Sequence, residues 1–221
     1  MSGLSLRSVS AAYGGQRVLD PITLTIEAGE KVALVGRSGA GKSTLLSLLF
    51  DSERRDIAYM PQELGLVQAL SVFHNVYMGR LAVNATWYNI ANLVWPFKDE
   101  VAAVQAVLEP LGLTAKLWSP AGELSGGQRQ RTAVARTIYQ NADILLADEP
   151  VSALDGPQAH NVMGILTTNY ATAVLAMHDV ELALRYTNRV VGIDDGRIAL
   201  DEPAERLTAE DLLPLYQGET A

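Results

Sequence analysis

The sequence contains no cysteine among its 221 residues. This absence excludes a disulfide framework and any metal site built on thiolates. The sequence also has no run of about 18 uninterrupted apolar residues, which a membrane-spanning helix would need. Its start, MSGLSLRSVS, lacks the basic head and the apolar run of a signal peptide. We therefore expect a soluble protein on the cytosolic side of the membrane.

Basic residues are in deficit as well, because 17 Lys and Arg stand against 25 Asp and Glu and give a net charge of −8. This sign argues against a general binder of nucleic-acid backbones, and we expect no nucleic-acid partner. Hydrophobic residues make up 48% of the chain, enough to fill a core. The length suits one sizeable domain, or a domain with a subdomain.

Expected strands and helices alternate along much of the chain. Polar and apolar residues alternate in residues 4–13 and 22–29, which predicts strands. Short apolar runs and helical patterns extend this prediction to strands at 31–36, 56–60, 144–148, 172–177, 189–193 and 197–200, and to helices at 42–50, 126–140, 156–169 and from about 180. Such alternation indicates an α/β fold with a parallel sheet covered by helices. We expect a single domain over residues 1–221, with a helical arm inserted at about 65–140.

The stretch GRSGAGKS lies between an expected strand and an expected helix, and it matches the pattern G-x-x-x-x-G-K-[ST]. In this pattern backbone amides surround phosphates, the Lys reaches the outer phosphates, and the hydroxyl binds magnesium. A chance match in a chain of this length is on the order of one in a hundred, which argues against an ordinary turn. We therefore predict a nucleotide site built by Gly36, Arg37, Ser38, Gly39, Ala40, Gly41, Lys42, Ser43 and Thr44.

The stretch ILLADEP places two adjacent carboxylates, Asp148 and Glu149, at the end of an apolar strand. Buried charges need a partner or a metal ion, so these acids make little sense as core residues. We expect Asp148 to hold magnesium and Glu149 to polarise a water molecule for hydrolysis. The alternative is a solvated strand end with incidental acids, and the nearby phosphate loop argues against it.

The stretch AGELSGGQRQR begins a second glycine-rich helix. Ser125 and Gln128 fit a capping box, which is sufficient to start a helix. Capping does not require Gly126 and Gly127, however, and each glycine gives up as much as ~1 kcal/mol of helix propensity relative to alanine. Bare amides at a helix N-terminus favour a phosphate. We therefore expect this helix to serve a phosphate.

The sequence LSGGQ, followed by a helix and by ILLADEP, resembles the signature of ATP-binding-cassette (ABC) ATPases, the motor subunits of ABC transporters. The resemblance extends from Tyr13 to His178. It implies a P-loop NTPase with a RecA-like parallel-sheet core, a small antiparallel β subdomain and an α-helical signature subdomain. Gln62 lies only 20 positions after Lys42, so we expect the β subdomain to be shortened.

The resemblance also implies roles for residues outside the phosphate loop. Tyr13 matches the aromatic residue that stacks on adenine, and Gln62 matches the glutamine that contacts magnesium and the attacking water. His178 matches the histidine that contacts the γ-phosphate, and SALD, which ends at Asp155, matches a loop that crosses a dimer interface. The residues alone leave alternatives open. Tyr13 could simply be an aromatic residue at a strand end, His178 an ordinary core or edge histidine, and Asp155 the N-cap of the helix that follows it.

In the ABC family two cassettes face each other head to tail and enclose ATP and Mg²⁺ between them. The resemblance implies that this chain forms such a homodimer. The residues that would reach the nucleotide of the other copy are Ser125, Gly126, Gly127, Gln128 and Asp155.

The helical arm suggests the class of transported substrate. Six of the fourteen aromatic residues lie between residues 73 and 97 of this arm, namely Phe73, Tyr77, Trp87, Tyr88, Trp95 and Phe97. This density is typical of a surface where a partner docks, although some of these rings must pack the arm itself. The segments VFHNVYMGRL and TWYNIANLVWPFKDE resemble the ATPases of phosphonate importers.

This resemblance implies an ATP-hydrolysing importer subunit for phosphonate or a related phosphorus oxyanion. Its partners would be a transmembrane permease and, through the permease, a substrate-binding protein. Its location would be peripheral, on the cytoplasmic face of the inner membrane. The alternatives are an ATPase of another importer, an exporter or a lipoprotein-releasing system, and a soluble ABC ATPase outside transport.

Overall fold

The computed structural model describes residues 3–51 and 56–216. The chain divides into two compact units. The first, here called the sheet unit, comprises Met1–Gln62, Asp143–Pro150 and Tyr170–Ala221, and the second, the helical unit, comprises Glu63–Ala142 and Val151–Asn169. The helical unit contains the expected arm and also residues 151–169, because the helix in that segment packs against the signature helix.

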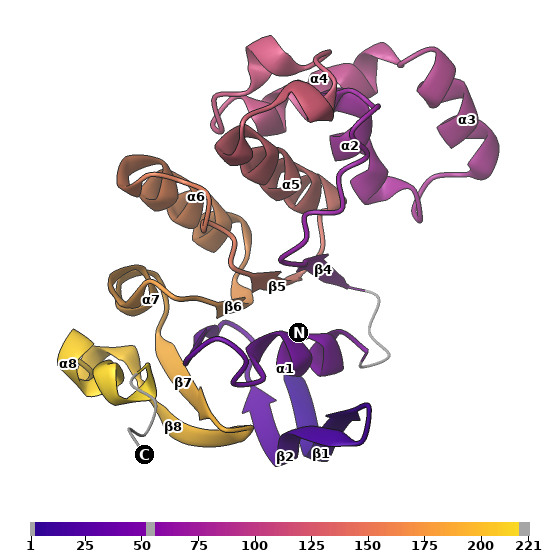
Figure 1. Cartoon of the computed structure of the whole chain (residues 1–221). Coiled ribbons are helices and arrows are strands. Elements are labelled where there is room, and N and C mark those ends of the chain that lie inside the picture. The colour runs from indigo at the N-terminus through magenta and orange to yellow at the C-terminus, as the bar shows by residue number, and fades with distance from the viewer. Residues whose placement is uncertain (1–2, 52–55, 217–221) are drawn as a thin grey trace. The chain divides into compact units, whose positions relative to one another are not determined.

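Within the described residues, the main sheet of the sheet unit has the strand order β4-β5-β6-β3-β7-β8 (Figure 1). The strands from β4 to β7 pair in parallel, and β8 pairs with β7 in the antiparallel direction. Their bounds are β3 Lys31–Val35, β4 Ile57–Met60, β5 Ile144–Asp148, β6 Thr172–Ala176, β7 Arg189–Asp194 and β8 Arg197–Pro203. Every residue of β5 and β6 is buried, as expected for strands covered on both faces. The structure therefore confirms the P-loop NTPase fold.

The helices of the sheet unit are α1 Lys42–Phe50, α7 Val180–Tyr186 and α8 Ala209–Leu212. Helix α1 follows the glycine-rich loop directly and buries Leu45, Leu46 and Leu49. These leucines recur at helical spacing, so one face of α1 joins the core while its N-terminus stays at the loop.

A small antiparallel sheet consists of β1 Leu4–Tyr13 and β2 Gln16–Ile26. The sequence predicted a second strand only from residue 22. It begins earlier because Gly14 and Gly15 both adopt positive φ, 58° and 83°, and form a tight hairpin turn. Tyr13 therefore pairs with Gln16 at the tip of the hairpin.

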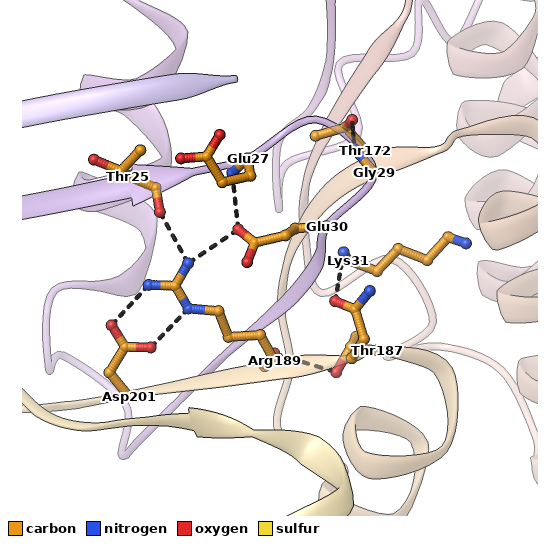
Figure 2. A network of polar contacts seen from close by, with 10 residues as sticks. Thr25, Glu27, Gly29, Glu30, Lys31, Thr172, Thr187, Arg189 and Asp201 are labelled. Carbon is orange, nitrogen blue, oxygen red and sulfur yellow. Dashed lines mark hydrogen bonds and ion pairs between the residues drawn. The ribbon is translucent and has the colours of Figure 1, made fainter. Parts of the chain in front are cut away.

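One arginine ties this hairpin to the main sheet (Figure 2). The Arg189 guanidinium donates to both carboxylate oxygens of Asp201, at 2.7 and 2.8 Å. On its other side it donates to the Thr25 carbonyl and the Glu30 carboxylate, each at 2.9 Å. Such a bidentate, charge-assisted arrangement is stronger than neutral hydrogen bonds. The end of β2 is thereby fixed to β7 and β8.

The helical unit contains α2 Val72–Tyr77, α3 Thr86–Val94, α4 Lys98–Leu108, α5 Gly126–Gln140 and α6 Gly156–Asn169. Helix α5 packs against α2, α4 and α6, and the fully buried Phe73, Val76, Val104 and Leu108 contribute to the interior of this unit. The sequence also predicts helices from Val72 to about Gly112, with breaks near residues 83–89 and 95–100. The structure has breaks between α2 and α3 and between α3 and α4, although α3 begins at Thr86, within the first predicted break. Among the described residues, we find no helix whose length and apolar character would let it cross a bilayer.

Candidate nucleotide-binding site

The loop between β3 and α1 is shaped by three glycines. Gly36, Gly39 and Gly41 have φ angles of 142°, 81° and 109°, which residues with a side chain rarely adopt. At Gly36 a Cβ atom would also lie 2.2 Å from the Ile193 carbonyl oxygen. No side chain among the described residues caps the start of α1. The amides of its first turn are therefore available to an anion.

Lys42 is almost fully buried, with 6% of its surface exposed. Its Nζ donates to the carbonyl oxygens of Gly36, at 2.6 Å, and Arg37, at 2.9 Å. Burial lowers the pKa of Lys42, while the negative charges of Asp148 and Glu149 act in the opposite direction. A desolvated cation therefore lies under the loop, where an anionic ligand would stabilise its charge.

The carboxyl end of β5 carries both predicted acids. Asp148 is 3% exposed and is the last residue of the strand. Glu149 follows with φ of 52°, an uncommon conformation for a residue other than glycine, and its N–H donates to the Ala176 carbonyl at 3.0 Å. Its Oε1 lies 2.8 Å from Nε2 of His178. Because β5 and β6 are parallel neighbours, their ends bring Glu149 and His178 together.

These groups meet at a pocket of about 360 Å³, a size typical of small-molecule sites. The pocket is lined by Val18, Ser38, Gly39, Gly41, Lys42, Ser43, Thr44, Gln62, Asp148, Glu149 and His178. All of them belong to the sheet unit. Sequence reasoning did not select Val18, because a single valine in a strand carries no chemical signal.

Other predicted residues lie outside the lining. Ala40 is buried in the loop, and Gly36 and Arg37 contribute the carbonyls that Lys42 contacts. Tyr13 lies at the hairpin tip and is 62% exposed.

The start of α5 forms the capping box that its sequence predicted. Ser125 Oγ accepts the Gln128 N–H at 3.3 Å, and Gln128 Oε1 accepts the Ser125 N–H at 3.0 Å. A Cβ atom at Gly127 would lie 3.2 Å from the Ala153 carbonyl oxygen and from a Leu154 methyl group. At Gly126 the nearest atom would be 3.9 Å away. Packing within the chain thus favours glycine at 127 but not at 126.

Asp155 caps α6. Its carboxylate accepts the backbone N–H of Gln158 at 3.0 Å and the side-chain amide of the same residue at 2.7 Å. The preceding loop is held by Gln130, whose Oε1 accepts the Ala153 N–H at 2.6 Å. Within this chain, Asp155 therefore acts as the N-cap of α6. All of these residues belong to the helical unit.

A separate apolar groove of about 260 Å³ lies on the helical unit. It is lined by Leu70, His74, Tyr77, Met78, Leu81, Thr86, Asn89, Ile90 and Leu93. His74 joins two of its walls, because its Nδ1 lies 2.7 Å from Ser71 Oγ and its Nε2 lies 3.2 Å from the Leu93 carbonyl oxygen. Among the aromatic residues of the arm, Phe73 and Tyr77 are buried, whereas Trp87 and Trp95 are exposed.

Comparison with known proteins identifies the family. The model of the family described as ABC transporter matches residues 19–53 and 50–152. The chain belongs to the ABC transporter family. The ATP-binding proteins of this family are ATPases that power transport.

Two curated relatives and one solved structure illustrate the similarity. The phosphonates import ATP-binding protein PhnC 1 of Halalkalibacterium halodurans is 39% identical, over 96% of this chain and 94% of the relative. PhnC of Anaeromyxobacter dehalogenans is 38% identical over 97% of this chain, which spans only 48% of that longer relative. A bacterial ABC transporter cassette solved as a dimer superimposes with a TM-score of 0.75 at 25% identity, over 91% of this chain and 98% of the cassette.

Proposed function

We propose that this chain is the ATP-hydrolysing subunit of an importer for phosphonate or a related phosphorus oxyanion. The observation that carries the ATPase role is the pocket that joins the glycine loop, Lys42, Gln62, Asp148, Glu149 and His178. The substrate class is supported by relatives named as phosphonates import proteins, which match nearly the whole chain. We also propose that residues 1–221 form one nucleotide-binding domain, with the helical subdomain inserted at about 65–140.

The pocket suits Mg²⁺ as well as a nucleotide. Ser43, Gln62 and Asp148 bring a hydroxyl, an amide oxygen and a carboxylate to its lining. Oxygen donors of this kind, together with phosphates and water, are the ligands that Mg²⁺ prefers. Bound with ATP, the ion would neutralise phosphate charge.

Each residue of the pocket has its own role in the proposed hydrolysis of ATP. The amides of the loop and of the first turn of α1 bind phosphate oxygens, and Lys42 exchanges a carbonyl partner for one of them. Glu149 polarises the attacking water, and its left-handed backbone fixes where the carboxylate points. His178 holds that carboxylate and contacts the terminal phosphate. We propose that the Tyr13 ring stacks on the adenine ring of ATP.

We propose that the catalytic form is a homodimer in which each copy completes the ATP site of the other. The residues supplied to the partner are Ser125, Gly126, Gly127, Gln128 and Asp155. Among the described residues, no atom would crowd a Cβ atom at position 126, so packing does not require glycine there, which supports this role. The similar cassette solved as a dimer supports it too.

The energies involved are sufficient for a switch. Moving a pair of cassettes from mostly open to mostly closed needs about 5.5 kcal/mol of differential binding. Two ATP molecules share this, so each must supply roughly 2.7 kcal/mol. Charge-assisted hydrogen bonds contribute about 1.5–3 kcal/mol each, so a few contacts from the start of α5 to the terminal phosphate are enough. Hydrolysis removes that phosphate and reopens the pair.

The apolar groove of the helical unit is the proposed docking surface for the permease. Its lining is mostly apolar and includes the exposed side chains of Ile90 and Leu93. An amphipathic helix of the permease fits such a groove. The ATPase would then work at the cytoplasmic face of the inner membrane, with a substrate-binding protein reached through the permease.

The experiment is growth of cells that lack this protein, with phosphonate as the sole source of phosphorus. We expect no growth on phosphonate and normal growth on phosphate. The wild-type gene should restore growth, whereas a gene encoding Glu149→Gln should not. Normal growth of the deletion strain on phosphonate would reject the substrate class and favour another transport system, while failure to co-purify with any permease would favour a soluble ABC ATPase.

A further inference from the structure

The outer side of the phosphate loop contacts a late segment of the same chain. After α8, the residues Leu213–Leu215 form a short 3₁₀ helix. The N–H of Arg37, the second residue of the loop, donates to the Leu215 carbonyl at 3.1 Å. One amide of the loop is therefore held by the late segment and does not face a phosphate.

Leu215 is anchored close to the point where the loop begins. Its side chain is 9% exposed and lies over Gly192, because a Cβ atom at Gly192 would be 2.5 Å from one of its methyl groups. Gly192 pairs with Val35, the last strand residue before the loop. Figure 1 shows α8 beside α7, and contacts link α8 to α7 and the 3₁₀ helix Leu213–Leu215 to β7. Leu215 thus rests on the strand pair that carries the loop.

The far end of the loop has its own support. The Gly196 N–H, in the turn between β7 and β8, donates to the Ala40 carbonyl at 3.3 Å, and the Gly196 carbonyl accepts the Asp20 N–H at 3.0 Å. The two ends of the loop are therefore fixed by different segments. Detaching Leu215 should release the N–H of Arg37, while Lys42 still holds the Arg37 carbonyl and the Ala40 end stays in place.

We infer that Leu215 is a positioning residue, which orders the phosphate loop before the nucleotide arrives. Glycines lose more conformational freedom than other residues when they are ordered, so a loop with three of them is costly to fix. Ordering the loop in advance reduces the cost of binding. This inference rests on the proposed function, since it matters only if the loop binds phosphates. It predicts an effect on any phosphate chain, with or without a nucleoside.

The test compares Leu215→Ala with Leu212→Ala. Leu212 is fully buried in α8, so the control removes a similar side chain from the same segment without a contact to Arg37. We would measure the Kd of Mg·ATP and of inorganic triphosphate by calorimetry, and the Tm without ligand. In Leu215→Ala both Kd values should rise about fivefold to tenfold, the loss expected for one hydrogen bond. In Leu212→Ala they should stay at the wild-type values although the Tm falls.

Two further variants keep the test decisive if Leu215→Ala does not fold. Leu215→Met keeps the apolar anchor and should bind both ligands like the wild type. Gly192→Ala should displace the Leu215 side chain and weaken the binding of both ligands. Unchanged Kd values in Leu215→Ala or Gly192→Ala, or an equal rise in Leu212→Ala, would overturn the inference. Wild-type protein that binds neither ligand would instead reject the proposed function.

Discussion

At the scale of single residues, Gly126 and Gly127 have different surroundings although they are neighbours at the start of α5. Gly127 lies against the Ala153 carbonyl, whereas Gly126 has room for a methyl group. The proposed homodimer gives a reason for glycine at 126, because a bare amide can approach a phosphate of the partner closely.

This difference leads to opposite effects of two alanine substitutions. Gly126→Ala should leave the stability of the nucleotide-free protein unchanged or raise it by up to about 1 kcal/mol, because alanine has the higher helix propensity. It should still lower ATPase activity. Gly127→Ala should destabilise the protein by about 1–3 kcal/mol through overpacking. Urea unfolding and ATPase assays measure both effects, and full activity in Gly126→Ala would argue against a role at the nucleotide.

Glu149→Gln tests the proposed base. The amide keeps the shape of the side chain but cannot polarise water as the carboxylate does, so the rate should fall at least about 100-fold. ATP binding should persist, and the ATP-bound dimer should accumulate because hydrolysis no longer opens it. Size-exclusion chromatography with ATP detects this dimer. Glu181→Gln, an exposed acid on α7, is the control and should behave like the wild type. A Glu149→Gln protein that stays monomeric with ATP would contradict the assignment.

At the scale of elements, the hairpin of β1 and β2 depends on Arg189. Arg189→Met would leave the carboxylates of Glu30 and Asp201 without their shared cation. Since these groups are partly exposed, we expect a loss of about 1–2 kcal/mol in the free energy of unfolding. Arg206→Met is the matched control, because its pair with Glu202 is longer and more exposed. Equal stability of the two variants would show that the network does not hold the hairpin.

The apolar groove of the helical unit can be tested apart from the nucleotide site. Ile90→Lys places a charge in its lining, where 60% of the isoleucine is exposed. We expect loss of co-purification with the permease and unchanged ATP binding by the isolated subunit. Val83→Lys is the control, because Val83 is 67% exposed and lies outside the lining. If the Ile90→Lys protein still co-purified with the permease, the groove would not be the docking surface.

Much of this element pattern could be predicted from the sequence. The helices at 42–50 and 156–169 and the strand at 144–148 have the predicted bounds, because strong periodicity and clear glycine or acidic boundaries mark them. The start of β2 could not be predicted. Pro21 and Asp20 interrupt its alternation, and only pairing with β1 extends the strand to Gln16.

In the candidate site, too, local motifs could be predicted from the sequence, whereas contacts between distant segments could not. Motifs with fixed spacing selected Lys42, Asp148 and Glu149, and the structure brings these residues to the lining of one pocket. The hydrogen-bond distance between Glu149 and His178, 29 positions apart in the sequence, depends on the order of strands in the sheet. Contacts such as Leu215 with Arg37 carry no local signal at all, because they arise from packing of distant segments.

At the scale of the whole molecule, we propose that one copy of this chain does not contain a complete ATP site. The sheet unit brings the loop, the acids and His178 to one pocket, whereas the glycine-rich helix start belongs to the helical unit. In the proposed homodimer each helix start serves the pocket of the other copy. Two variants that are each defective at a different part of the site should therefore complement each other.

The most direct measurement mixes Ser125→Arg with Lys42→Ala and determines the ATP retained in the dimer fraction. Lys42→Ala removes the buried cation of its own loop, and Ser125→Arg blocks the helix start that it offers to its partner. A mixed dimer still combines one intact loop with one intact helix start. We predict that the mixture forms ATP-bound dimers that neither variant forms alone. A mixture that retains no more ATP than the separate variants would contradict the account.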